Sequence, residues 1–148
     1  MHNRTKIYTD GACAGNQLQE NRGGYGAVIF KPGEEPFRLN GGYRNTTNNR
    51  MELKAAIESI KVLKEPCDIT LVTDSEYVAK AINEWMFGWI KKSFKGVKNV
   101  DLWEEYLSVS KGHKIKATWV RGHSGHPQNE ECDKIAKSQA EIYQKNGK

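Results

Sequence analysis

Long apolar segments are missing from this sequence. Its longest uninterrupted apolar run covers only residues 27–30, whereas a transmembrane helix needs about 20 such residues in a row. The N-terminal residues carry charges, but no apolar stretch of signal-peptide length follows them. We therefore expect a cytoplasmic protein that does not insert into a membrane.

Cysteine is scarce as well. The sequence holds 3 cysteines, an odd number without a Cys-x-x-Cys pair, which favours reduced thiols over a disulfide framework or a zinc knuckle. His123 and His126 lie near one of them, but no second closely spaced ligand pair accompanies them, so a zinc site is disfavoured. The three cysteines are Cys13, Cys67 and Cys132.

The composition is that of one folded domain with excess positive charge. A chain of 148 residues with 37% apolar residues can bury a core, which excludes a disordered chain. Lys+Arg exceeds Asp+Glu by 23 − 18 = +5, which favours a polyanionic partner, above all nucleic acid. We expect a single domain over residues 1–148, with a frayed tail at about 144–148.

Positive charge is concentrated between residues 90 and 100, where lysines occur without any acid. Cations suit phosphates and flat apolar rings suit sugars and bases, so their mixture indicates nucleic-acid contact, although a lysine run is usually only a solvated face. The lysines are Lys91, Lys92, Lys95 and Lys98. The interleaved aromatic residues are Trp85, Phe87, Trp89 and Phe94.

The first third of the chain is patterned as an antiparallel meander. Residues 6–10, 25–30 and 37–43 are predicted strands, separated by a Gly-, Asn- and Gln-rich loop over 11–22 and a turn over 31–36.

The pattern then changes to helix and strand in alternation. Apolar residues recur at three- and four-residue spacing, which predicts a helix over 48–64 that Pro66 ends. A strand followed by a helix and a strand requires a parallel crossover. The later predicted elements are a strand over 68–73, a helix over 75–85, a segment broken at Gly88 and Gly96, a helix over 100–110, a strand over 114–120 and a helix over 127–143.

Two acidic residues follow predicted strands. If the helix over 48–64 forms a right-handed crossover, Asp10 and Asp74 lie at the carboxyl ends of neighbouring parallel strands, where ligands of α/β sheets bind. Two carboxylates held so close repel each other unless a cation lies between them. The cation that suits them is Mg²⁺ or Mn²⁺.

Each acid also has a purely structural interpretation. Asp10 could open an Asp-Gly turn, and Asp74 could cap the following helix. Glu52 could complete a capping box, while Asp133 could pair with Lys137 one helical turn later. These separate interpretations leave the clustering of the acids unexplained.

Five longer motifs follow one another along the chain. They are Thr-Asp-Gly-Ala-Cys at 9–13, Thr-Thr-Asn-Asn-Arg-Met-Glu-Leu at 46–53, Thr-Asp-Ser-Glu-Tyr at 73–77, Val-Lys-Asn-Val-Asp-Leu-Trp at 97–103, and Gly-His-Ser-Gly-His at 122–126 with Asn-Glu-x-Cys-Asp at 129–133. Together these motifs resemble bacterial-type ribonuclease HI over essentially the whole chain. The resemblance implies a ribonuclease H-like α/β fold, a five-stranded mixed sheet whose first three strands are antiparallel, followed by parallel crossovers, with helices on both faces.

The resemblance implies an endonuclease that hydrolyses the RNA strand of an RNA/DNA hybrid, leaving 5′-phosphate and 3′-hydroxyl ends. Two Mg²⁺ ions, for which Mn²⁺ can substitute, would act on the scissile phosphate. By resemblance Asp10, Glu52, Asp74 and Asp133 are the metal ligands, and His123 assists proton transfer or product departure. A monomer without an obligate protein partner is expected.

The resemblance also implies how the hybrid is held. Glu76 departs from the family, which carries glutamine there, and the loop after Asn16 is longer and the basic handle shorter than usual. The RNA-strand residues are Cys13, Asn16, Asn48, Asn49 and Glu76. The DNA-strand residues are Thr47, Tyr77, Trp85, Trp89 and Asn99, and the four lysines form the basic handle.

Two other functions compete with this one. Another DNA nuclease of the same fold, such as a transposase or a Holliday-junction nuclease, would not resemble the motif at 46–53 and usually needs additional domains. A catalytically inactive nucleic-acid binding module predicts that a site acid has been replaced, and all four are present.

Overall fold

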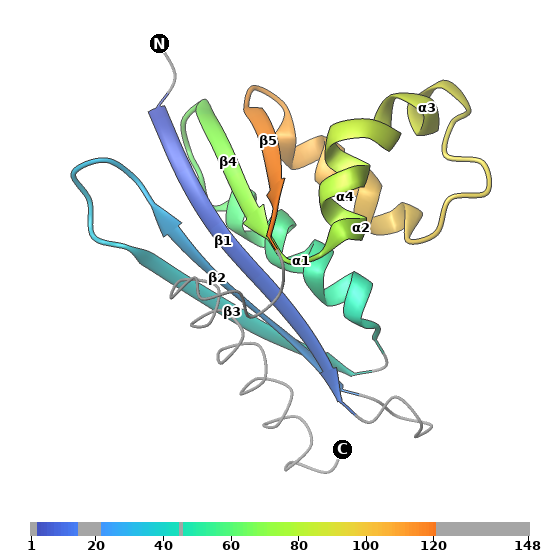
Figure 1. The fold of residues 1–148 in the computed structure, drawn as a ribbon, viewed down its shortest axis with the longest axis horizontal. Helices are drawn as coiled ribbons and strands as arrows, with labels where there is room; N and C mark the ends of the chain where they lie inside the picture. Colours follow the sequence, from blue (N-terminus) through green and yellow to red (C-terminus); the bar gives the residue numbers. More distant parts are fainter. Residues whose placement is uncertain (1–2, 15–21, 45, 121–148) are drawn as a thin grey trace.

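The computed structural model describes residues 3–14, 22–44 and 46–120 (Figure 1). The predicted closing helix over 127–143 lies outside these residues, as does the frayed tail. Asn16, His123 and Asp133 also lie outside them.

Five strands form one mixed sheet in the order β3-β2-β1-β4-β5. The β1–β2 and β2–β3 pairs are antiparallel, whereas β1–β4 and β4–β5 are parallel. The antiparallel meander and the parallel pairing of the first and fourth strands are therefore confirmed. The strands are β1 (Asn3–Ala14), β2 (Arg22–Phe30), β3 (Phe37–Arg44), β4 (Cys67–Thr73) and β5 (Lys114–Trp119).

The predicted loop over 11–22 is wrong at both ends, because β1 continues to Ala14 and β2 begins at Arg22. Asp10 pairs with Gly26 and Gly11 with Tyr25, so the Asp-Gly step is strand and not turn. Gly11 is required by packing, since a Cβ there would lie 2.5 Å from the backbone nitrogen of Glu52. Its glycine lets the first helix approach the strand closely.

Four α-helices and one π-helical turn lie among the described residues. The first helix ends at Lys61 and not at residue 64, several residues before Pro66. The helix over 100–110 is confirmed. The helices are α1 (Asn48–Lys61), α2 (Glu76–Lys80), α3 (Met86–Lys91) and α4 (Val100–Ser110), and the π-helical turn η1 (Ala81–Trp85) joins α2 to α3.

The predicted break at Gly88 is wrong, because helical structure continues from Glu76 to Lys91 and Gly88 lies within α3. No heavy atom lies within 4 Å of the position of a Cβ at Gly88, so this glycine only lowers local helix propensity. The break predicted at Gly96 is confirmed: the helix has ended, and Gly96 has a φ of +77° that glycine adopts without strain.

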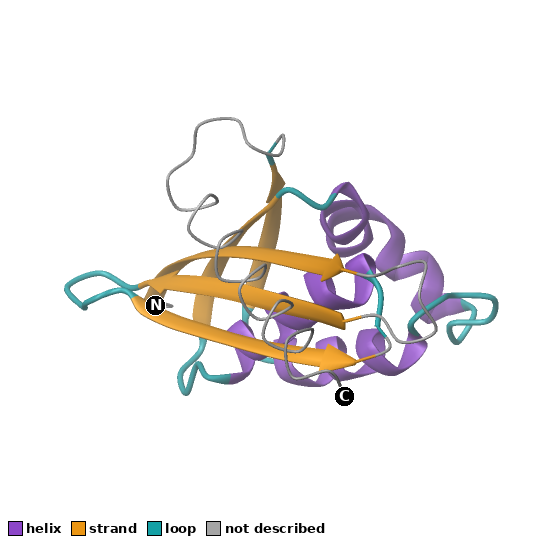
Figure 2. Cartoon of the chain, turned by 90° about the horizontal axis from the view of Figure 1, so that it is seen from below, coloured by secondary structure: helices purple, strands orange, loops and turns teal. Residues whose placement is uncertain are grey.

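The described helices pack against one face of the sheet (Figures 1 and 2). Ile7 and Leu71 from the sheet, Leu53 from α1 and Trp103 from α4 belong to one buried cluster there. The opposite face carries a smaller cluster around Tyr8. No helix in the described part of the chain is long and apolar enough to cross a membrane.

Candidate active site

Three acidic side chains meet where β1 and β4 approach the start of α1. Thr9 and Thr73 are partners in the parallel β1–β4 pair, so Asp10 and Asp74 follow at neighbouring positions. Glu52 joins them from α1, which packs closely on β1 at Gly11. One ligand oxygen from each of the three side chains lies within 4.8 Å of the others. The clustering of Asp10 and Asp74 predicted from strand order is therefore confirmed.

The electrostatics of this cluster are unfavourable without a cation. Asp10 and Glu52 are buried, and the Oε2 atom of Glu52 has no hydrogen-bond partner among the described residues. Burial, followed by the charges of Asp10 and Asp74, raises the pKa of Glu52 well above its ordinary value. Carboxylate oxygens are the ligands that Mg²⁺ and Mn²⁺ prefer, so the three residues fit such an ion.

The structural interpretations of these acids are wrong where the structure describes them. Asp10 lies inside β1 and opens no turn. The cap of α2 is Ser75 and not Asp74. The cap of α1 is Thr47, and Glu52 is buried in the acidic cluster and does not form a capping box.

Three of the predicted DNA-strand residues are aromatic, and their rings form a row along the helical segment over 76–91. The ring centroids of Tyr77 and Trp85 are 6.3 Å apart, and those of Trp85 and Trp89 are 5.8 Å apart. Trp89 rests on the buried Trp103 at 5.4 Å. We call Tyr77, Trp85 and Trp89 the aromatic row; Trp85 is its most open member, with 39% of its surface exposed.

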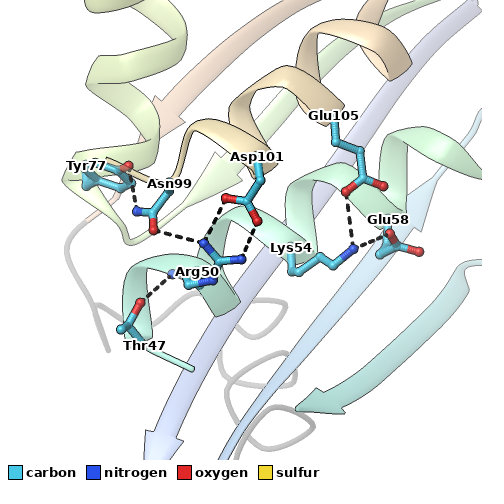
Figure 3. Close-up of polar contacts among 8 residues, drawn as sticks. All are labelled: Thr47, Arg50, Lys54, Glu58, Tyr77, Asn99, Asp101 and Glu105. Atoms are coloured by element: carbon cyan, nitrogen blue, oxygen red, sulfur yellow. Dashed lines mark hydrogen bonds and ion pairs between the residues drawn. The ribbon is translucent and has the colours of Figure 1, made fainter. Parts of the chain in front are cut away.

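A polar network connects the start of α1 with α4 (Figure 3). The Arg50 guanidinium donates to Asn99 Oδ1 at 3.2 Å and to both carboxylate oxygens of Asp101 at 3.1 and 2.7 Å. Asn99 in turn donates to the Tyr77 hydroxyl at 3.1 Å. The Thr47 hydroxyl accepts from the Arg50 backbone N–H at 3.1 Å. We call Thr47, Arg50, Asn99 and Asp101 the arginine network.

The arginine network brings together two of the predicted DNA-strand residues, Thr47 and Asn99. Arg50 was not among the predicted site residues, although it lies one helical turn after Thr47 within the motif at 46–53. The Asp101 hydrogen bond raises the pKa of Arg50, and Arg50 lowers the pKa of Asp101, so both stay charged.

The remaining predicted residues lie around these two groups. Asn48 and Asn49 open α1 and are exposed, next to Thr47. Glu76 is also exposed and pairs with Lys80 at 3.2 Å, one helical turn later. Cys13 lies in β1. The lysines of the handle are all exposed, at the end of α3 and in the turns that follow: Lys91, Lys92, Lys95 and Lys98.

Comparisons with known proteins show the family to which the chain belongs. The RNase H family model matches residues 2–141. Ribonuclease HI of Campylobacter jejuni is 55% identical over 135 residues, covering 91% of this chain and 90% of its own. The chain therefore belongs to the RNase H family of nucleases, as its five motifs predicted.

Solved structures share the fold. LC9-RNase H1, a type 1 RNase H with the type 2 active-site motif, has a TM-score of 0.83 and 30% identity, covering 96% of this chain and 74% of its own. LC11-RNase H1, solved in complex with an RNA/DNA hybrid, has a TM-score of 0.68 and covers 95% of this chain and 99% of its own; at 18% identity its likeness shows the fold alone.

Proposed function

We propose that the protein is an endonuclease that hydrolyses the RNA strand of RNA/DNA hybrids, leaving 5′-phosphate and 3′-hydroxyl ends. The observation that carries this proposal is the cluster of Asp10, Glu52 and Asp74, whose ligand oxygens lie within 4.8 Å of one another in a chain of the RNase H family. The hybrid in the LC11-RNase H1 structure is consistent with the same substrate class.

The carboxylates supply the metal site of this reaction. Asp10, Glu52 and Asp74 would hold Mg²⁺, with Asp133 as a further ligand and Mn²⁺ as a substitute ion. The chemistry supplied by two ions held there would be activation of a water molecule and stabilisation of the leaving oxygen. Within the protein, strand backbone positions Asp10, and His123 carries a proton during the reaction or assists product departure.

The arginine network and the aromatic row hold the DNA strand in this proposal. Arg50 uses three of its five N–H groups on Asn99 and Asp101, which leaves donors for a phosphate oxygen beside the Thr47 hydroxyl. The flat rings of Trp85 and Trp89 suit the apolar side of deoxyribose. Because Asp101 fixes the plane of the guanidinium, the phosphate meets an oriented group.

The RNA strand is recognised by residues at the end of β1, at the start of α1 and at the start of α2, together with Asn16. Hydroxyl groups at the 2′ position distinguish RNA from DNA, and side-chain amides can both donate to them and accept from them. The residues proposed for this role are Cys13, Asn16, Asn48, Asn49 and Glu76.

The exposed lysines at the end of α3 and after it form a basic handle that contacts phosphates. Replacing all four by alanine raises KM and flattens the salt dependence of hybrid binding, because fewer counterions are released, while kcat stays near its original value. An unchanged KM across the salt series would leave these lysines as an ordinary solvated face.

The monomeric state and the cytoplasmic location stay predictions from the sequence.

The experiment that tests the proposal compares end-labelled RNA/DNA, RNA/RNA and DNA/DNA duplexes of one sequence at saturating Mg²⁺. We expect cutting of the RNA strand in RNA/DNA alone, since each strand of the substrate is recognised by its own sugar. Comparable cutting of DNA/DNA would indicate a DNA nuclease of the same fold. Binding without any cutting would indicate an inactive binding module.

A further inference from the structure

In the described sheet, the outer edge of the last strand, β5, is occupied by a side chain from a helical segment, at a position where another strand could pair. β5 pairs with β4 and lies at one end of the strand order. The Ala117 N–H in β5 donates to Asn83 Oδ1 at 3.1 Å, and Asn83 Nδ2 donates to the Ala117 carbonyl at 2.8 Å. Both backbone groups of Ala117 that face away from β4 are therefore satisfied by one side-chain amide, as a neighbouring strand would do.

This side chain belongs to the π-helical turn that carries Trp85 of the aromatic row. Asn83 lies in η1, two residues before Trp85 and six before Trp89. A π-helical turn changes the angular spacing of side chains along a helix and occurs often at functional sites. The pair of hydrogen bonds thus fixes the helical segment to the sheet just before the two indole rings.

Packing holds only part of this helical segment. Among residues 82–90, Met86 is buried and Ile82 and Trp89 are partly buried against the core, whereas Trp85 is 39% exposed. Besides the Asn83 pair, the side-chain hydrogen bond that links β5 to residues 74–91 is that of Trp119 Nε1 to the Asp74 carbonyl, at 3.1 Å. The Asn83 hydrogen bonds therefore add to burial just before the exposed Trp85.

We propose that Asn83 is a positioning residue for DNA-strand binding: its amide fastens η1 to the edge of β5 and thereby holds Trp85 and Trp89 in the aromatic row. This inference rests on the proposed function, since it assigns the row to the DNA strand. Asn83 itself touches neither the substrate nor the acidic cluster in this account. Its loss should weaken hybrid binding without slowing the chemical step.

The test uses Asn83→Ala in the full chain, with Ile60→Val as a matched control. Alanine is a better helix former than asparagine, so a loss of function in the variant cannot be attributed to helix propensity. Ile60 is buried in α1, outside the helical segment over 76–91, and its shortening lowers stability without removing a hydrogen bond. Steady-state cleavage of an RNA/DNA hybrid is measured for both, together with amide hydrogen exchange at Ala117.

We expect Asn83→Ala to raise KM about threefold or more with kcat within about twofold, and Ile60→Val to change neither by that much. Exchange at Ala117 should accelerate in Asn83→Ala alone. In a Trp85→Ala background the further effect of Asn83→Ala on KM should be clearly smaller, because one of the two indole rings to be positioned is gone.

A wild-type KM in Asn83→Ala, or the same fold-change with and without Trp85, would overturn the inference and leave Asn83 as a stabilising contact only. Wild-type cleavage is scored first. If the wild-type protein does not cut the hybrid, the proposed function fails. If it does, and Asn83→Ala keeps the wild-type KM, the positioning role alone fails.

Discussion

The acidic cluster and the arginine network both include residues of α1, but charges of one sign meet in the cluster, whereas opposite charges are paired in the network. In the cluster, buried carboxylates face each other, and a Glu52 oxygen has no partner among the described residues. In the network, Arg50 and Asp101 are paired and 31% and 65% exposed in their side chains. A buried uncompensated charge is costly, whereas an exposed pair is nearly neutral for stability. The cluster therefore needs a cation to balance its charge, whereas the charges of Arg50 and Asp101 already balance each other.

The largest effect is expected from breaking the cluster. Asp10→Asn or Asp74→Asn should leave less than a tenth of wild-type cleavage, because each change removes a metal ligand but keeps the shape of the side chain. Hybrid binding should survive or improve, since less negative charge faces the phosphates. Glu105→Gln, at a paired acid that contacts Lys54 at 3.4 Å, is the control and should keep full activity. More than a tenth of activity in both site variants would refute the metal-ligand assignment.

Arg50→Lys should produce the next largest effect. Lysine keeps the charge but loses the planar fork that contacts Asn99 and Asp101 together. We expect KM for the hybrid to rise by about five- to thirtyfold, equivalent to roughly 1–2 kcal/mol, with kcat little changed. Arg38→Lys, at an exposed residue of β3, is the control. An unchanged KM in Arg50→Lys would show that the guanidinium of the arginine network does not contribute to substrate binding.

Neutralising an aspartate should change the free energy of unfolding in opposite directions in the acidic cluster and in the arginine network. In EDTA, Asp10→Asn should raise the free energy of unfolding by about 1 kcal/mol, because it relieves repulsion of the buried Glu52. Thermal or urea melts measure this. Added Mg²⁺ should stabilise the wild-type protein more than the variant, since it binds the folded cluster. A destabilised Asp10→Asn protein would show that the carboxylates support the fold without a cation.

The smallest effect is expected at Asp101. Arg50 lowers the pKa of Asp101 in the folded state, so the ion pair contributes stability above the unfolded pKa of about 4 and loses it as the pH falls through the lower folded value. Asp101→Asn should therefore cost about 0.5 kcal/mol at pH 7, less at high salt, because the pair is exposed. The difference from wild type should disappear near pH 2. A difference that persists in acid would come from packing.

Strand pairing and the meeting of Asp10 with Asp74 could be predicted because they depend on strong regularities. Alternating apolar residues mark strands, and crossovers between parallel strands are right-handed, so the two strand ends meet. Glu52 and the DNA-strand set came from the family resemblance. The structure brings Glu52 to the two aspartates, and the roles of the DNA-strand residues stay predictions.

Other features could not be predicted because tertiary contacts decide them. Gly11 and Gly88 suggest the end of a strand and the end of a helix. In the structure, Gly11 is needed within β1 where α1 approaches it, and Gly88 lies within α3. Arg50 and Asn83 are single polar residues with no periodic signal. Their partners, Asp101 and Ala117, are 51 and 34 positions away in the sequence.

Cleavage of the RNA strand of an RNA/DNA hybrid as a function of Mg²⁺ concentration tests the central claim most directly. With wild-type protein in EDTA, the labelled RNA strand should stay intact, and added Mg²⁺ should restore cutting to products with 5′-phosphate and 3′-hydroxyl ends. Under the same titration, Asp10→Asn should stay inactive while still binding the hybrid. Cutting by the wild-type protein in EDTA, or equal Mg²⁺-dependent cutting by Asp10→Asn, would contradict the account.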